Sequence, residues 1–537
     1  MSMVKKNIYW ILILLITLLS VKSLFHYGLI PTHDGEYHII RFYEFDKVLR
    51  SGILYPRWAP DLNNGYGIPL FNYVYPLPNY AASLIHVFGF SFIDSFKLSL
   101  IIASLFGSIF SYLWLRRFFG NLPALIGSIF FIYSPYRFVD IYVRGSIGEI
   151  WAMSLFLGVL WGTTEYIYIR KMKYFIISSI LLAFTIFAHN ILGFMYFVFY
   201  ITYLLFMFIN KKEHGEKKMF IIPILSLCIS AIFWIPALFE TGYVRGLQVF
   251  DVNNNFPELF QLIFPSWGTG FSTTDLNNQM SYQVGVANIF IVFCSIFLIR
   301  IKNEHKKLML FFLGSFFFVI YLILSYSAWI WQHVPLIAYF QFSWRLLSLI
   351  VVFTAFISAY VANAFSGRII RLTLLLLPIV FALQYTTPAY YLERPDSYYT
   401  TRPNFIDGTN SPGNVFNTKW MNGLLVKNND HVSGGENVEY QLLQKSASEA
   451  KFLVKTEKKQ TILVGIAYFP GWKIFVDEKE VQTTYNKDGI IALSLEEGNH
   501  VVSVVFENTN IRIIATTISL ISLIGIFILV FRKRFKI

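Results

Sequence analysis

The chain has 537 residues, of which 55% are hydrophobic, 19% aromatic and only 14% charged. This balance excludes an ordinary soluble domain and is typical of a polytopic membrane protein that lives in a lipid bilayer. The net charge of +13 does not indicate a nucleic-acid partner, because Lys and Arg fall mostly in short connections between apolar runs. Cys228 and Cys294 lie inside apolar runs, so neither a disulfide framework nor a thiolate metal site is predicted.

The first apolar run, residues 8–30, is long enough to cross a hydrocarbon core of about 30 Å. Lys5 and Lys6 precede it, and the positive-inside rule therefore predicts a cytoplasmic N-terminus. A cleaved signal peptide is the competing interpretation, but the run is long and has no small-x-small cleavage site before Pro31. Residues 31–94 are then predicted to form the first outer segment.

Within that segment, the apolar residues of 36–50 recur at steps of three and four. The pattern predicts an amphipathic helix on the outer surface, with Arg41, Glu44 and Lys47 on its other faces. Residues 55–80 are rich in Pro, Gly, Asn and aromatic side chains, which is typical of a structured loop at the membrane interface.

Apolar runs then alternate with basic connections and with polar, aromatic connections. Every basic connection falls on the side that a cytoplasmic N-terminus assigns to the cytoplasm. We therefore predict about twelve membrane crossings, with both termini in the cytoplasm. The polar residues collect in the connections predicted to lie outside.

The stretch 388–510 has a different pattern, with short alternating segments punctuated by Gly, Asn and Asp. Such a pattern predicts antiparallel strands in a sandwich-like domain on the extracytoplasmic side. The predicted fold is an α-helical transmembrane domain over 1–387, this β-rich domain over 388–510, and a final membrane helix with a basic cytoplasmic tail over 511–537. The predicted location is the cell membrane, with multiple passes.

The candidate reaction centre is the motif 31–41, where His33, Asp34, Glu36, His38 and Arg41 crowd together directly after the first apolar run. One interpretation is that Asp34 caps the following helix and Glu36 favours its dipole, which is worth about 1 kcal/mol. The other is that Asp34 is a general base, while Glu36 and the histidines position substrate or hold Mg²⁺ or Mn²⁺. Capping needs only one carboxylate and leaves both histidines unexplained.

Later outer connections carry further candidates with their own alternatives. Asp140 and Arg144 are four residues apart and form either a solvated ion pair or a phosphate site at Arg144. Arg345 either snorkels to the interface or binds a lipid phosphate. His189 has the position of a helix-end histidine. The candidate substrate-binding residues are His33, His38, Arg57, Asp140, Arg144, Glu149, His189 and Arg345.

Several of these motifs resemble the bacterial membrane protein family described as "6-pyruvoyl-tetrahydropterin synthase related". They are residues 32–41, 55–60, 65–71 and 134–137, together with 142–145 and Glu149. Residues 467–477 are similar to the C-terminal extracellular domains of polytopic bacterial glycosyltransferases. No pterin chemistry follows, because pterin synthases are small soluble proteins with a three-histidine zinc site.

The layout, with an acidic motif in the first outer segment, resembles GT-C glycosyltransferases, which take sugar from a polyprenyl-phosphate carrier. The resemblance implies a hexosyl- or pentosyltransferase with a polyprenyl-phosphate sugar donor and an extracytoplasmic glycan, lipid or protein acceptor. It also implies that Asp34, with Glu36 second, is the base or metal contact. The motif here is Asp-Gly-Glu between histidines, so a metal requirement stays open.

Two other classes of protein fit the same sequence. A transporter or flippase for a lipid-linked glycan would also need polar residues among membrane helices. A non-catalytic scaffold could bind envelope glycans through its outer domain. The enzyme is preferred because the charged motifs gather in the outer connections rather than in the middle of the apolar runs.

Overall fold

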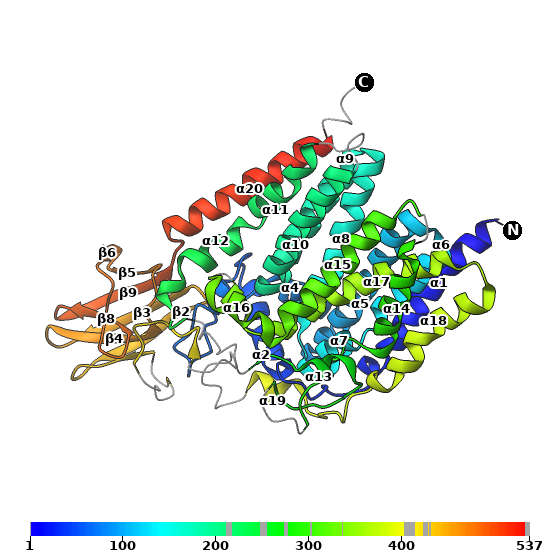
Figure 1. The fold of residues 1–537 in the computed structure, drawn as a ribbon. Helices are drawn as coiled ribbons and strands as arrows, with labels where there is room; N and C mark the ends of the chain where they lie inside the picture. The colour runs from blue at the N-terminus through cyan, green and yellow to red at the C-terminus, as the bar shows by residue number, and fades with distance from the viewer. Residues whose placement is uncertain are drawn as a thin grey trace.

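The computed structural model describes residues 2–210, 217–246, 255–272, 278–300, 303–335, 337–401, 414–422, 428 and 431–531. Figure 1 shows a large helical body with the β-strands gathered at one end of it. This confirms the predicted fold class of a polytopic helical protein with a C-terminal β domain.

The helical body is built from the first 400 of the 537 residues. Its helices are α1 (Ser2–Ser20), α2 (Gly35–Arg50), α3 (Leu70–Tyr73), α4 (Leu77–His86), α5 (Phe92–Phe119), α6 (Asn121–Ile132), α7 (Pro135–Phe138), α8 (Ile147–Ile169), α9 (Met172–Ala188), α10 (Asn190–Asn210), α11 (Ile221–Ile229), α12 (Ala231–Phe239), α13 (Leu259–Ile263), α14 (Val286–Phe297), α15 (Lys306–Ile323), α16 (Ala328–His333), α17 (Leu347–Ala364), α18 (Arg368–Ala382) and α19 (Asp396–Thr400). After the strands, α20 (Asn510–Phe531) returns along α11 and α12 (Figure 1).

Within the described residues, seven helical segments are long and apolar enough to cross a membrane. They are α5, α8, α10, α15, α18, α20 and the segment 343–364 that contains α17. Two bent pairs, 121–132 with 135–144 and 217–229 with 231–239, could each form one broken span. Counting both pairs gives up to nine spans. Three further apolar helices, 8–20, 172–188 and 286–300, are shorter than a full crossing, so the number of about twelve crossings stays a prediction.

Helix α8 lies at the centre of this body. It packs against α5 and α9, and its side chains are buried over almost the whole length. A helix that is apolar on all faces belongs in such a central position. Glu149, in the first turn of α8, is therefore carried into the protein interior.

The strands form two antiparallel sheets, in the orders β1-β4-β8-β7 and β2-β3-β9-β5-β6. The strands are β1 (Val432–Ser433), β2 (Glu439–Lys445), β3 (Glu449–Thr456), β4 (Gln460–Ala467), β5 (Trp472–Val476), β6 (Lys479–Val481), β7 (Thr484–Tyr485), β8 (Ile490–Leu495) and β9 (Gly498–Phe506). Both sheets contribute buried residues to one core, including Val454 and Val504 from one and Ile462 and Leu493 from the other. The predicted sandwich-like arrangement is therefore confirmed.

The core between the sheets also contains Trp58 from the first outer segment, whose ring lies 5.4 Å from that of Trp472. The loop that carries Trp58 continues over α2, where the Asp61 N–H donates to the Glu44 carboxylate at 3.1 Å. Glu44 is only 1% exposed, so its predicted place on a solvent-facing side of the helix is wrong. Burial raises the pKa of this carboxyl, because its charged form loses water.

Candidate active site

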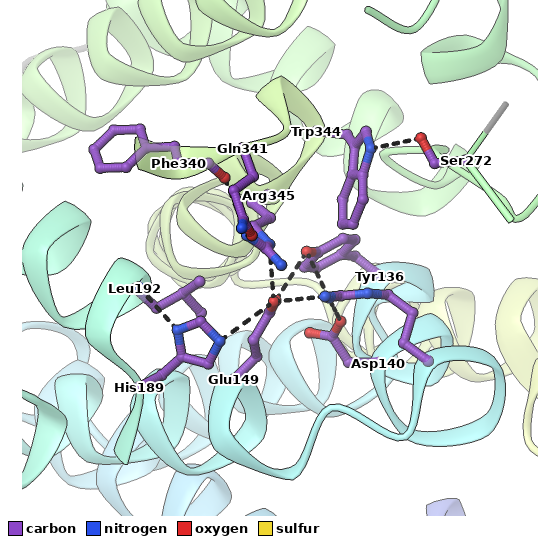
Figure 2. A network of polar contacts seen from close by, with 11 residues as sticks. Tyr136, Asp140, Glu149, His189, Leu192, Ser272, Phe340, Gln341, Trp344 and Arg345 are labelled. Carbon is purple, nitrogen blue, oxygen red and sulfur yellow. Dashed lines mark hydrogen bonds and ion pairs between the residues drawn. The ribbon is translucent and has the colours of Figure 1, made fainter. Parts of the chain in front are cut away.

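Four buried charged side chains, one of which is Glu149, form a cluster (Figure 2). Arg144 donates from Nη2 to Glu149 Oε1 at 2.7 Å and from Nη1 to Asp140 Oδ1 at 2.5 Å. Arg345 Nε lies 3.2 Å from the same Glu149 oxygen. Because two carboxylates face two guanidinium groups, the charges of this cluster balance.

The break between α6 and α7 creates the cluster. The chain bends by 47° there and then forms a π-helical turn, η2 (Val139–Arg144), which ends at Gly145. The turn carries Asp140 and Arg144 to the start of α8, and the Ser146 N–H donates to the Asp140 carbonyl at 2.9 Å. Such π turns are uncommon and are often found at functional sites.

Two neutral side chains complete the surroundings of Glu149. Tyr136 on α7 donates to Glu149 Oε2 at 3.2 Å. His189 accepts from the Leu192 N–H through Nδ1, so its neutral ring carries the proton on Nε2, which lies 3.9 Å from Glu149 Oε1. His189 therefore ends a helix, as predicted, and also faces the cluster.

Arg345 lies in the short helical turn η9 (Ser343–Leu346) and is 8% exposed. It also donates to the Phe340 carbonyl at 3.1 Å and to the Gln341 side chain at 2.5 Å (Figure 2). These contacts hold the guanidinium group inside the protein, which rules out the snorkelling interpretation. Similarly, the pair of Asp140 and Arg144 is buried rather than solvated.

The first outer segment is bound directly to this cluster by its backbone. The Asp34 N–H donates to the Arg144 carbonyl and the His33 N–H to the Val143 carbonyl, both at 2.9 Å. Gly145 has a φ of +66°, and a Cβ there would lie 2.3 Å from Thr32 Oγ1. The two segments, more than a hundred residues apart in sequence, thus pack backbone to backbone.

The capping interpretation of Asp34 is wrong. Asp34 occupies the N-cap position of α2, but its side chain makes no capping hydrogen bond. Thr32 takes this role instead, since its hydroxyl accepts from the Gly35 N–H at 3.1 Å.

Three rings connect the outer segment to the cluster. Tyr75 stacks on His189 with centroids 4.8 Å apart, and His38 lies 6.4 Å from Tyr75. Burial lowers the pKa of His38 to about 3, and Arg41 acts in the same direction. The pKa of Tyr75 is raised chiefly by burial, and the charges of both Asp34 and Glu149 add to the increase. Both carboxylates therefore act on the same small region.

Three predicted site residues make their main contacts elsewhere. Glu36 pairs with Arg394 at 2.9 Å, just before α19. His33 bonds through Nε2 to the Thr269 carbonyl at 2.9 Å, and burial lowers its pKa. Arg57 donates to Asn72 at 2.8 Å, in a second buried network that contains Glu240 and Arg512.

A divalent metal does not fit the residues predicted to hold it. Glu36, one of the two predicted ligands, is paired with Arg394, whose guanidinium group competes with a metal ion for this carboxylate. In the part of the chain that the structure describes, no group of three or more His, Cys, Asp or Glu side chains could hold a metal ion. The chemistry below is therefore derived from the side chains alone.

Some residues of the site were not predicted from the sequence. Tyr136 and Tyr75 each touch a predicted residue, and Trp344 lies 4.7 Å from the Arg144 guanidinium through its ring. Trp344 directly precedes Arg345 in the sequence. An aromatic residue beside an arginine in a membrane protein indicates a cation–π contact, and this pattern could have identified Trp344 as a site residue. Tyr75 and Tyr136 carry no such signal, because each is one of many aromatic residues at a loop or helix start.

Fold and site together define a polytopic membrane protein with a balanced cluster of buried charges at a broken helix and a C-terminal β-sheet domain. The chain belongs to the membrane protein family described as "6-pyruvoyl-tetrahydropterin synthase related domain", which it matches over residues 71–392. The matched region includes the whole charge cluster, although it begins after Asp34.

An uncharacterized protein of Lactococcus lactis subsp. cremoris (strain MG1363) is 22% identical over 254 residues, which are 46% of this chain and 41% of that protein. The chain thus matches about two fifths of the length of this curated relative.

Three solved structures are similar to this chain at low identity. The oligosaccharyltransferase of Archaeoglobus fulgidus in the apo form has a TM-score of 0.44 and 13% identity, over 74% of this chain and 57% of that chain. The arabinofuranosyltransferase AftD from Mycobacteria has a TM-score of 0.45 and 15% identity, over 73% of this chain and 28% of that chain. ArnT from Cupriavidus metallidurans bound to undecaprenyl phosphate has a TM-score of 0.32 and 11% identity, over 75% of this chain and 95% of that chain.

Proposed function

We propose that this protein is a membrane glycosyltransferase that transfers a sugar from a polyprenyl-phosphate-linked donor to an extracytoplasmic acceptor. The observation that carries the proposal is the bond of the Asp34 backbone to the Arg144 carbonyl, which fixes the acidic motif against the buried arginines. Ionisable residues inside a membrane protein are costly, and they mark functional sites by default.

In this reaction Asp34 acts as the general base. It removes the proton from an acceptor hydroxyl, whose oxygen then forms a bond to the anomeric carbon of the sugar. The bond between that carbon and the phosphate oxygen breaks, and the polyprenyl phosphate leaves with the electron pair. Arg144 and Arg345 stabilise the negative charge on the leaving phosphate, since guanidinium groups match two phosphate oxygens.

The carboxylates of the cluster keep these arginines in place before a donor binds. Glu149 contacts both guanidinium groups, and Asp140 contacts Arg144. Asp140 Oδ2 is buried and has no hydrogen-bond partner among the described residues, so it can accept from a hydroxyl of the bound sugar. A site that is already ordered lowers the cost of binding the donor.

An apolar groove of about 250 Å³ supports a lipid-linked donor. Its lining is entirely apolar and includes Leu262, Val284 and Ile320. Tyr282, two residues before Val284, lies 6.0 Å from the ring of Trp344, which contacts Arg144. We propose that a polyprenyl chain lies in this groove and that its phosphate reaches the arginines.

Substitution of the proposed base tests the function. Asp34→Asn is expected to lower transfer from a radiolabelled undecaprenyl-phosphate-linked hexose or pentose by about 10² to 10⁴. Asp61→Asn is the matched control, because Asp61 lies in the same outer segment and pairs with Lys47 at the surface. The control should keep its activity, and undiminished transfer by Asp34→Asn would remove Asp34 from the role of base.

One observation favours transport of a lipid-linked glycan as the second candidate. Transporters often bind substrate at interrupted helices, and the bent pair 121–132 with 135–144 ends in Arg144. The same labelled donor, enclosed in vesicles with the purified protein, separates the two functions. Movement of the intact donor across the bilayer without release of sugar would support transport, whereas sugar on an acceptor supports the enzyme.

A further inference from the structure

Three aromatic side chains form a ring cluster on the surface of the β domain. Tyr468 and Tyr485 stack with centroids 4.6 Å apart and planes at 27°, and Trp420 meets Tyr468 edge-on at 4.8 Å. Tyr485 lies on the outer strand β7 and is 44% exposed, while the other two are half-buried. We call these three residues the aromatic platform.

Backbone contacts hold the aromatic platform in place. Gly489 has a φ of +77°, and a Cβ there would lie 2.5 Å from the Trp420 carbonyl oxygen, so only glycine permits this approach. The Tyr468 N–H donates to the Gly489 carbonyl at 2.8 Å, and the Asn422 amide donates to the Lys487 carbonyl at 2.6 Å. The rings are therefore ordered before any ligand binds, which reduces the entropy lost on binding.

Hydrogen-bonding groups surround the rings. Lys419 and Lys487 are exposed, and Asp488 is half-buried in the turn that follows β7. The ammonium group of Lys419 lies 4.9 Å from the ring of Trp420. Aromatic faces within a polar rim are the composition expected of a binding site that recognises both an apolar face and polar edges.

We propose that the aromatic platform binds an oligosaccharide. A pyranose ring has an apolar C–H face, which packs on an aromatic face, and hydroxyl groups at its edge, which bond to Lys, Asn and Asp side chains. A lipid chain would need apolar neighbours, whereas positions 419, 422, 487 and 488 are Lys, Asn, Lys and Asp. A quaternary ammonium group is disfavoured, because the positive charge of Lys419, 4.9 Å from the ring of Trp420, would repel a second cation but not a neutral sugar.

Glycan binding at this surface does not depend on the transfer reaction. The aromatic platform lies on the β domain, and none of its residues belongs to the charge cluster around Glu149. If the proposed function is correct, such a site would hold a glycan acceptor close to the membrane. If no transfer is detected, the proposed glycan site is still tested independently by the binding experiment.

The test measures binding of four named oligosaccharides to the full-length protein in lipid nanodiscs. They are chitohexaose, maltohexaose, cellohexaose and α-1,6-mannohexaose, each titrated by isothermal calorimetry. We expect at least one to bind, and Tyr485→Leu, which keeps apolar bulk but removes the ring face, to weaken it about tenfold. Tyr485→Phe keeps the ring and should bind like the unaltered protein.

Tyr440→Ala is the matched control, because Tyr440 is 36% exposed on β2 of the other sheet. Its affinity should stay unchanged. Thermal unfolding of each variant checks the fold, and Tyr485→Ala is the replacement if Tyr485→Leu unfolds. Failure of all four oligosaccharides to bind, or equal binding by the variants without the ring, would overturn the proposal. So would binding of tetramethylammonium in place of the sugars.

Discussion

One carboxylate oxygen of Glu149 contacts two guanidinium groups, that of Arg144 at 2.7 Å and that of Arg345 at 3.2 Å. All three side chains are buried and have almost no access to water. Removing charges from water is expensive, and such clusters seldom add to stability over an apolar core of the same volume. Their presence beside an acidic motif therefore favours a role in chemistry. A phosphate that displaced Glu149 or Asp140 from an arginine would change the balance of charge within the site.

At the scale of single residues, His38 predicts how stability depends on pH. Its pKa is lowered from the usual 6.5 to about 3, chiefly by burial. Between these values the unfolded chain binds a proton that the folded protein does not, so the free energy of unfolding falls as the pH is lowered through this window. The loss is roughly 1.4 kcal/mol per pH unit, and thermal unfolding between pH 7 and 4.5 measures it.

His38→Gln should lower the number of protons taken up on unfolding by about one, and so flatten the pH dependence, because glutamine does not titrate in this pH range. His333→Gln is the control, since His333 is exposed on α16 and has no comparable burial. A slope that is the same in His38→Gln and in the unaltered protein would contradict the assignment of a buried neutral histidine.

At the scale of elements, the π-helical turn η2 and the start of α2 act as one unit through Gly145. Gly145→Ala would place a Cβ 2.3 Å from Thr32 Oγ1 and 3.1 Å from the Gly35 nitrogen, forcing the two segments apart. We expect a destabilisation of about 1 to 3 kcal/mol and a loss of transfer, because Asp34 would move away from Arg144. Thermal unfolding and the transfer assay measure the two effects.

Gly120→Ala is a matched control for the backbone strain alone. Gly120 also has a positive φ, +76°, but a Cβ there meets nothing within 4 Å. It should cost about 1 kcal/mol and leave transfer unchanged. Equal loss of transfer in both variants would show that contact between the segments is not what matters.

At the scale of the whole molecule, a second buried ion pair joins the β domain to the helices. Arg512 at the start of α20 bonds to Glu240 at 2.9 Å and to the Pro470 carbonyl at 3.0 Å. Glu240→Gln and Arg512→Met should each destabilise the protein by about 3 to 5 kcal/mol, because each leaves one buried charge unpaired. The double variant should lose clearly less than the sum, and an additive loss in thermal unfolding would contradict the coupling.

The two regions predicted to be extracytoplasmic are held together in space. Leu29 exchanges backbone hydrogen bonds with Leu392, and Trp58 packs in the core of the β domain. Residues 31–41 and the strands are therefore joined to one another, and we propose that they lie on the same side of the membrane. We propose that this side is extracytoplasmic and that both termini are cytoplasmic, as the distribution of basic residues predicts.

Cysteine labelling of intact cells tests this orientation. In a protein with Cys228→Ser and Cys294→Ser, a membrane-impermeant maleimide should label Lys458→Cys, which lies in the exposed turn between β3 and β4. Lys171→Cys, exposed between α8 and α9, should be labelled only after lysis. The reverse pattern would place the candidate site on the cytoplasmic side and contradict the proposed acceptor.

The amino-acid sequence alone determined the class of the protein, the presence of many apolar helices and the β-rich character of the stretch 388–510, because composition and periodicity are local properties of the chain. It also identified Asp140, Arg144, Glu149, His189 and Arg345 as candidates, since charged residues stand out among apolar ones. It could not determine their partners. Only the tertiary structure decided that Glu149 contacts both arginines and that Glu36 pairs with Arg394. Such contacts join residues that are far apart along the chain, so they depend on how the helices pack and leave no local pattern in the sequence.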